Sequence, residues 1–104
     1  MIAKTKSPAE HIFRALASEA RICIVKELSA ADEKCVFDLV GCCGLGWSTV
    51  SHHLAILRKA GIVTDDKRGQ QVFYRLALPC VTDFIQCLEK SARTKTRRKS
   101  SCCP

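Results

Sequence analysis

The sequence predicts a mainly helical fold in which five helices accompany one two-stranded β-hairpin. Apolar residues recur at the i, i+3, i+4 spacing of a helix face from Pro8 to Gly61. The pattern then changes to short runs rich in β-branched and aromatic residues over 62–65 and 71–77, which is typical of strands. The helical spacing returns after Pro79, so the hairpin is expected between the fourth and fifth helices.

Two helices are expected at the start of the chain. The stretch PAEHIFRALA, residues 8–17, begins with Pro8, and proline favours the first turn of a helix. The second helix follows Ser18, a residue that caps helices well, and ends near Ser29. The apolar faces that predict these helices are formed by Ile12, Ala15 and Leu16, and by Ile22, Val25 and Leu28.

A third and a fourth helix are expected on either side of a glycine-containing turn. The third extends from about residue 33 to 43, with Asp32 as its cap and Gly44 as its stop. The turn LGW leads into the fourth, STVSHHLAILRKAG, which ends before Gly61. Their apolar faces comprise Val36, Leu39 and Val40, and Val50, Leu54 and Leu57.

A β-hairpin and a final helix complete the predicted fold. Gly69 supplies the turn between the two strands, and Lys67 and Arg68 make the tip of the hairpin basic. The last helix, PCVTDFIQCLEKSA, carries an apolar stripe formed by Val81, Phe84, Ile85 and Leu88.

The distribution of charge suggests a polyanionic partner. The chain of 104 residues has a net charge of +7. Residues 58–104 contain eleven Lys and Arg against four Asp and Glu, so the excess lies in the C-terminal half. We expect residues 1–91 to form one domain and residues 92–104, which have almost no apolar anchor, to form a flexible basic tail.

The short helix, glycine-containing turn and polar helix together predict a helix-turn-helix, with the hairpin as its wing. In this motif the second helix enters the major groove of DNA, and its first residues meet the base edges. Basic residues near the end of that helix and on the wing suit contacts with phosphates. The expected DNA-binding residues are Trp47, Ser48, Thr49, Ser51, His52, Arg58, Lys67 and Arg68.

Eight cysteines need a separate explanation. The chain has neither the apolar run of a membrane span nor that of a signal peptide, so we expect a cytoplasmic protein with no membrane partner. In a reducing compartment, cysteines indicate thiols, metal ligands or redox chemistry rather than disulfides. No CxxC pair is present, which disfavours a structural zinc site.

Three stretches together resemble the ArsR/SmtB family of bacterial winged-helix repressors: FRALASEARICIVKEL, CVFDLVGCCGLGWSTVSHHLAILRKAGIV and DDKRGQQVFYRL. The resemblance covers about residues 10–90. It implies a homodimer formed through the first and last helices, operator DNA as partner, and release from DNA when a metal or metalloid binds. It implies a regulator rather than an enzyme, and the sequence contains no paired nucleophile and base.

The resemblance also narrows the choice of metal or metalloid that could act as the inducer. Zinc and nickel sensors of the family use His and carboxylates on the last helix, whereas this chain has no His after His53. The best-known arsenic sensors of the family contain CVCDL, whereas this chain reads CVFDL, with Cys35 at the first position and Phe37 at the second. Cys42 and Cys43 are candidate helpers, but Cys42 lies about 10 Å from Cys35 along a helix axis.

The remaining cysteines suggest a relocated arsenic site. Soft thiolates select soft acceptors, and trivalent arsenic binds three sulfurs, or two when it carries an organic group. Variant arsenic sensors of the family are known to use cysteines of the last helix and the C-terminal tail. We expect arsenite, methylarsenite or antimonite as inducer and no organic cofactor. The expected ligands are Cys80, with Cys87 as its substitute, together with Cys102 and Cys103.

Other interpretations stay open at this stage. Cys23, Cys80 and Cys87 are small enough to serve as core residues, and a dispensable terminus is the alternative reading of the tail pair. A repressor of the same fold that senses oxidants or persulfides through its thiols is the main alternative function. A constitutive architectural DNA-binding protein is another.

Overall fold

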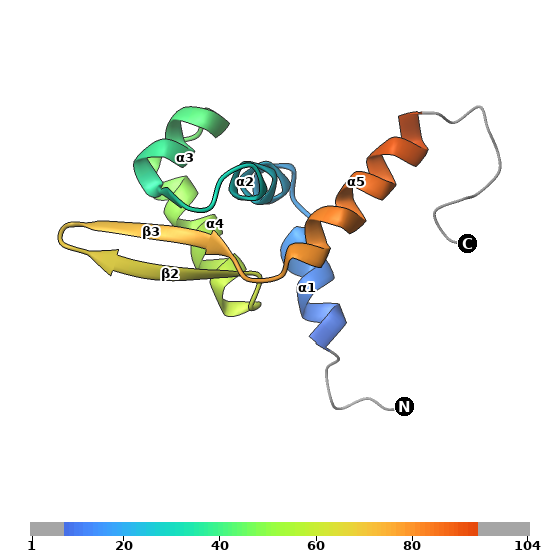
Figure 1. Cartoon of the computed structure of the whole chain (residues 1–104), viewed down its shortest axis with the longest axis horizontal. Coiled ribbons are helices and arrows are strands. Elements are labelled where there is room, and N and C mark those ends of the chain that lie inside the picture. Colours follow the sequence, from blue (N-terminus) through green and yellow to red (C-terminus); the bar gives the residue numbers. More distant parts are fainter. Residues whose placement is uncertain (1–7, 94–104) are drawn as a thin grey trace.

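The computed structural model describes residues 8–93 and confirms five helices with a hairpin (Figure 1). The first two residues of the predicted tail, 92 and 93, belong to the last helix, and the rest of it, including Cys102 and Cys103, lies outside the described residues. The helices are α1 (Pro8–Leu16), α2 (Glu19–Ser29), α3 (Val36–Cys43), α4 (Trp47–Lys59) and α5 (Pro79–Arg93). The strands are β1 (Lys34–Cys35), β2 (Val63–Arg68) and β3 (Gln71–Leu76).

The helices pack together, and the β2–β3 hairpin extends away from them on the side opposite α5 (Figure 1). The sheet is antiparallel with the order β1-β3-β2, and the hairpin register pairs Val63 with Leu76 and Arg68 with Gln71. The turn between the strands therefore consists only of Gly69 and Gln70, and Gly69 adopts the positive φ that this turn requires.

The short strand β1 is absent from the predicted fold, and the expected start of the third helix is wrong. Lys34 and Cys35 pair with Tyr74 and Phe73 of β3, so the helix begins only at Val36 with Cys35 as its N-cap residue. Asp32 lies before the strand and does not cap the helix. The backbone groups of Lys34 and Cys35 find partners in a strand some forty residues further along the chain, and a local sequence pattern does not contain that information.

The starts of α2 and α4 lie close to their predicted positions. The second helix has the predicted cap, since the backbone N–H of Arg21 donates to the Ser18 hydroxyl at 3.4 Å. The fourth helix begins at Trp47, one residue earlier than expected, with Gly46 in the cap position.

The predicted helix faces meet in one hydrophobic core. Among the described residues, this core contains no buried polar or charged side chain. Val81 and Ile85 attach α5 to the core, and the Lys26–Glu89 ion pair at 2.9 Å joins α2 to α5 as well. The fully buried side chains are Ile24, Val25, Leu28, Leu39, Val50, Leu54, Leu57, Ile62 and Val63.

Gly44, which ends α3, is expected to be sensitive to substitution. Its φ is +68°, a left-handed conformation that costs an L-residue about 1–2 kcal/mol. Apart from its neighbours along the chain, a methyl group at this position would have no atom within 4 Å, so the cost is one of backbone conformation alone. We expect Gly44→Ala to lower the free energy of unfolding by about 1 kcal/mol, measured by urea denaturation.

Gly41 provides the matched control, because it lies inside the same helix and also has open space around it. Gly41→Ala is expected to raise the free energy of unfolding by about 0.5–1 kcal/mol. Equal effects of the two substitutions would contradict the backbone explanation.

Candidate nucleic-acid interface and thiol sites

The structure contains the predicted helix-turn-helix. The Gly44 N–H donates to the Val40 carbonyl at 3.0 Å and closes α3, and only Gly44, Leu45 and Gly46 separate α3 from α4. One face of α4 packs into the core through Val50, Leu54 and Leu57. This anchoring fixes which side of α4 faces the solvent.

The predicted base-reading residues occupy the outer side of α4. Trp47 is 55% exposed, Ser48, Thr49 and His52 are exposed, and Ser51 is half-buried. These side chains offer hydroxyl and imidazole groups at the N-terminal half of the helix, where base contacts are made in this motif.

Two basic side chains lie near the other end of α4. Arg58 and Lys59 in the last turn are both exposed, and the Arg58 Nε lies 3.7 Å from a carboxylate oxygen of Asp65 on β2. Arg58 therefore lies where α4 meets the wing, a position that suits a phosphate contact.

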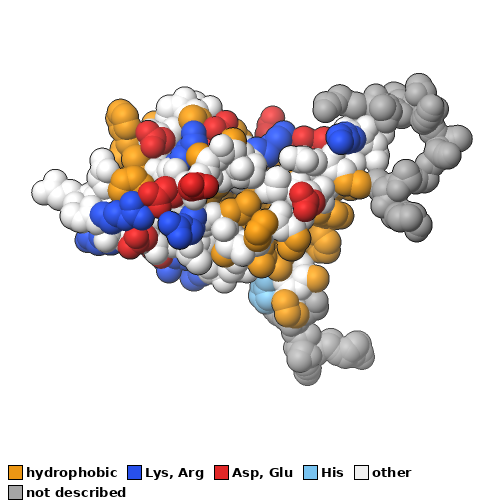
Figure 2. All heavy atoms as spheres, in the orientation of Figure 1, with side chains coloured by type: hydrophobic (Ala, Val, Ile, Leu, Met, Phe, Trp, Pro, Cys, Tyr) orange, Lys and Arg blue, Asp and Glu red, His pale blue; other side chains and the backbone are white. Residues whose placement is uncertain are grey.

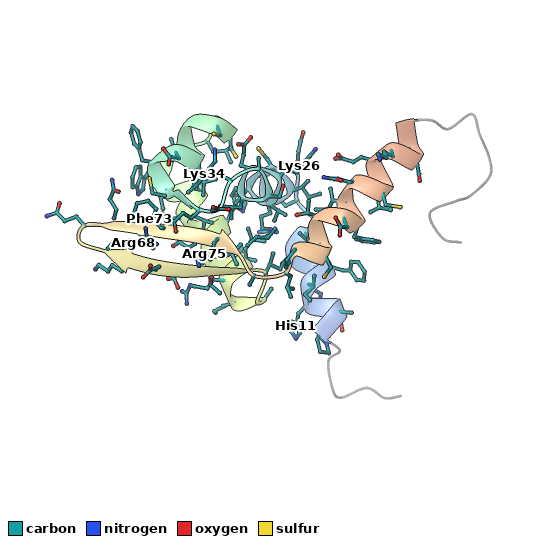
Figure 3. The ribbon with its side chains drawn as sticks, in the orientation of Figure 1. His11, Lys26, Lys34, Arg68, Phe73 and Arg75 are labelled. Carbon is teal, nitrogen blue, oxygen red and sulfur yellow. The ribbon has the colours of Figure 1, made fainter. Side chains whose placement is uncertain are left out.

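Arg68 was expected at the tip of the wing, but its position and its contacts in the structure are different. Lys67 and Arg68 both belong to β2 rather than to the turn, and Lys67 is exposed. The Arg68 guanidinium donates to both carboxylate oxygens of Glu33 at 2.8 Å and to Asp66 at 2.9 Å. It also lies 4.6 Å from the centre of the Phe73 ring (Figure 3). Any phosphate contact by Arg68 competes with these partners.

Glu33 links the segment before β1 to the wing. It accepts hydrogen bonds from Arg68 and, at 3.1 Å, from Arg75 on β3. Hydrogen bonds from Arg68, and then from Arg75, lower the pKa of the Glu33 carboxyl from 4.5 to about 2. No local sequence signal indicates this pairing, because the partners are 35 and 42 residues apart.

Glu33 is expected to make stability depend on pH under acidic conditions. A carboxyl whose pKa is lower in the folded state stabilises the fold above its unfolded pKa and loses this contribution as the pH falls towards its folded pKa. The melting temperature should therefore fall more steeply between about pH 4.5 and about pH 2 in the wild type than in Glu33→Gln. Asp66→Asn, which removes the other carboxylate on Arg68, is the control and should retain most of the wild-type slope.

His53 is set apart from its exposed neighbour His52. It is half-buried, and its Nδ1 lies 3.3 Å from an Arg21 guanidinium nitrogen. Burial first, and then the charges of Arg21 and His52, lower the pKa of His53. His53 therefore favours its neutral form and helps to position α4 against α2.

The two cysteines of α5 are more than one helical turn apart. Cys80 is exposed and Cys87 is half-buried. Seven residues of helix separate their backbones by about 10 Å along the axis, so the pair does not hold one ion by itself. The structure thus leaves them separate, and their predicted partners Cys102 and Cys103 lie outside the described residues.

The α3 position of the usual arsenic site is not arranged for metal binding. Cys35 is only 7% exposed, and its sulfur lies 3.5 Å from a carboxylate oxygen of Asp38. Phe37, which replaces the second cysteine, is 67% exposed. Within residues 8–93, no group of three or more His, Cys, Asp or Glu side chains is placed to hold a metal ion.

A thiol pair that the sequence does not predict lies between α2 and α3. The Cys23 thiol donates to the Cys43 sulfur at a distance of 2.9 Å. The sequence indicates only a packing role for Cys23, since no local spacing connects it to a cysteine twenty positions away. The adjacent Cys42 is exposed, and its sulfur accepts from the Lys34 ammonium at 3.4 Å.

An apolar surface lies where α1 and α5 meet. The rings of Phe13 and Phe84 contact each other with centroids 5.7 Å apart, yet they are 56% and 43% exposed. Leu88, one turn further along α5, is 52% exposed. Figure 2 shows hydrophobic side chains gathered on this part of the molecule, whereas Lys, Arg, Asp and Glu crowd the hairpin.

Comparison with known proteins agrees with this arrangement. Residues 18–65 match the family described as bacterial regulatory protein, arsR family. Over 69 residues the chain is 44% identical to the HTH-type transcriptional repressor SmtB of Mycobacterium tuberculosis, covering 66% of this chain and 50% of that protein. Over 66 residues it is 42% identical to the arsenical resistance operon repressor of Escherichia coli, covering 64% and 56%.

A solved structure extends the match to nearly the whole domain. HlyU from Vibrio cholerae superimposes with a TM-score of 0.72 at 34% identity, covering 86% of this chain and 96% of that one. The fold and the exposed polar face of α4 therefore define a winged helix-turn-helix domain, and the relatives that the chain matches are named as transcriptional repressors. The chain belongs to the ArsR family.

The chain spans about half the length of the curated relatives it matches, 50% and 56% for the two repressors. In the part of the chain that the structure describes, no helix has the length and apolar character needed to cross a membrane.

Proposed function

We propose that the chain is a homodimeric transcriptional repressor that binds operator DNA and is released when trivalent arsenic binds its cysteine thiolates. Residues 1–91 form the DNA-binding and dimerisation domain in this proposal, and residues 92–104 form a tail that carries two of the ligands. The supporting observation is that α5 combines an exposed thiol, Cys80, with the exposed apolar residues Phe84 and Leu88. A sensor thiol on a dimerisation helix couples ligand binding to the relative orientation of the two subunits.

The DNA-binding part of the proposal rests on α4 and the wing. On the polar side of α4, Trp47, Ser48, Thr49 and His52 are exposed and Ser51 is half-buried, while the apolar side is anchored in the core. The matched residues 18–65 include all of α4, and the two curated relatives are named as repressors. In a two-fold symmetric dimer, two such helices read two half-sites about one turn of DNA apart.

The choice of arsenic rests on the chemistry of the thiols. One relative is named for arsenical resistance, but the second cysteine of the usual arsenic site is Phe37 here, and Cys35 is buried. Cys80 is accessible, Cys87 is half-buried, and each needs further sulfur ligands because they lie two turns apart. Cys102 and Cys103 supply those sulfurs in this proposal, and arsenite, methylarsenite and antimonite are the ligands that such a set takes.

Release from DNA requires that the ligand bind one state of the dimer more tightly than the other. Capture of the tail thiols by a cysteine of α5 would hold the basic tail against the dimer helices. In the DNA-binding state, the two α4 helices match the spacing of the half-sites. Because the ligand binds the other state more tightly, it shifts the dimer away from the DNA-binding state.

The experiment measures release from a DNA duplex that the reduced protein selects from a random pool. Fluorescence anisotropy follows release on addition of arsenite, methylarsenite, antimonite, cadmium, peroxide or polysulfide. We expect the trivalent arsenic and antimony compounds to weaken DNA binding by about 10- to 100-fold. Stronger release by peroxide or polysulfide would instead support the thiol-redox alternative, and no release by any of them would indicate a constitutive DNA-binding protein.

Serine substitutions then identify the ligands. The double variant Cys102→Ser/Cys103→Ser should lose the arsenic response, and the effects of Cys80→Ser and Cys87→Ser decide which α5 thiol participates. Cys35→Ser is the matched control at a buried thiol and should respond like the wild type. Full arsenic responsiveness of the double variant would overturn the proposed site.

A further inference from the structure

Cys23 and Cys43 form a close pair of chemically reactive side chains that the proposed arsenic site does not use. Cys23 lies in α2 and Cys43 is the last residue of α3, and their sulfurs are 2.9 Å apart. A disulfide bond requires a sulfur–sulfur distance of about 2.05 Å. The two sulfurs are therefore about 0.9 Å further apart than a disulfide bond allows, and a movement of α3 relative to α2 has to close this difference.

We propose that Cys23 and Cys43 form a reversible disulfide under peroxide, and that this bond weakens DNA binding by displacing the C-terminal end of α3. The inference rests on the DNA-binding part of the proposed function and is independent of the arsenic ligands. The two sulfurs are arranged for a bond with each other rather than for binding a metal ion. Within residues 8–93, no third His, Cys, Asp or Glu completes a metal-binding group with them.

The surroundings of the two sulfurs assign their roles. Burial first, and then the interaction with the neighbouring Cys23, raise the pKa of Cys43 to about 12, so Cys43 stays protonated at neutral pH. In this proposal Cys23 is the sulfur that attacks the oxidant, and Cys43, which lies 2.9 Å away, is the sulfur that then closes the disulfide. Both side chains are half-buried, which leaves a path for a small oxidant.

The chemistry balances with hydrogen peroxide as the oxidant. The Cys23 thiolate attacks one peroxide oxygen, the O–O bond breaks, and the departing hydroxide takes a proton to become water. This leaves Cys23 as a sulfenic acid. The Cys43 sulfur then attacks the Cys23 sulfur, the S–O bond breaks, and the hydroxide leaves with the Cys43 proton as a second water. The two thiols lose two electrons and peroxide gains them; an added dithiol reverses the reaction.

The bond acts on DNA binding through the short connection between α3 and α4. Cys43 is separated from Trp47, the first residue of α4, by only three residues, and the two helices pack against each other. Drawing the end of α3 towards α2 moves the turn that positions the N-terminal half of α4. Since that half carries the predicted base-reading side chains, its displacement lowers the affinity for DNA.

Cys42 offers a matched control within the same turn of helix. It is exposed, and its sulfur is hydrogen-bonded by Lys34 rather than by Cys23. Peptide mapping of the peroxide-treated full chain should find Cys23 linked to Cys43, with a loss of two hydrogens in mass. The link should persist in Cys42→Ser and disappear in Cys23→Ser and Cys43→Ser. Circular dichroism checks that each variant is folded.

The DNA measurement uses the duplex selected by the reduced protein and one variant that keeps only Cys23 and Cys43. This variant combines Cys35→Ser, Cys42→Ser, Cys80→Ser, Cys87→Ser, Cys102→Ser and Cys103→Ser. This variant lacks the proposed arsenic ligands. Its disulfide form should bind DNA about tenfold more weakly than its reduced form, and a dithiol should restore binding. The inference is overturned if Cys23 and Cys43 stay unlinked, or if the linked protein binds DNA as tightly as the reduced one. Failure of the reduced wild type to bind any DNA would instead overturn the proposed function.

Discussion

Phe84→Glu is expected to convert the protein from a dimer to a monomer and to weaken operator binding by about 10²-fold or more. Phe84 is 43% exposed and contacts Phe13, which is itself 56% exposed, at the junction of α1 and α5. A carboxylate at this position would have to lose its hydration to enter an apolar interface, which is costly for an unpaired charge. A monomer engages a single half-site and loses the high effective concentration of the second reading helix.

Sedimentation velocity gives the oligomeric state, and fluorescence anisotropy with the selected duplex gives the affinity. Phe37→Glu is the matched control for oligomeric state, because Phe37 is 67% exposed on α3, away from the α1–α5 surface. It should leave the sedimentation coefficient unchanged. A Phe84→Glu protein that still sediments as a dimer would place the dimer interface elsewhere.

Leu54→Ala is expected to destabilise the fold by about 2–5 kcal/mol, a large part of the roughly 5–15 kcal/mol that typically holds a domain together. Leu54 is fully buried in α4 and belongs to the core formed with α2, α3 and the start of β2. Truncation removes apolar contacts and leaves a cavity that the surrounding helices fill only in part. Urea denaturation measures the loss.

His52→Ala, two residues earlier on the outer side of the same helix, separates stability from DNA binding. His52 is exposed, so this substitution should change the free energy of unfolding by no more than about 0.5 kcal/mol. It should nevertheless weaken DNA binding if the predicted interface is correct. Comparable destabilisation by the two substitutions would contradict the assignment of the buried and exposed faces of α4.

Much of the fold was predictable because it depends on local patterns. The faces of α2 and α4, the cap at Ser18 and the stop at Gly44 follow from residues within one or two helical turns of each other. The exposed polar side of α4 follows from the same periodicity, so most of the proposed DNA-binding residues were found without the structure. The assignment of these residues to DNA contacts stays a prediction.

The sequence by itself determined the helices, the helix-turn-helix, the hairpin and the number of available thiols. Only the tertiary structure decided that β1 joins the sheet, that Glu33 binds Arg68 and Arg75, and that Cys23 meets Cys43. These contacts join segments that are twenty or more residues apart. They depend on how separate elements pack, whereas periodicity and capping report only on neighbours along one element.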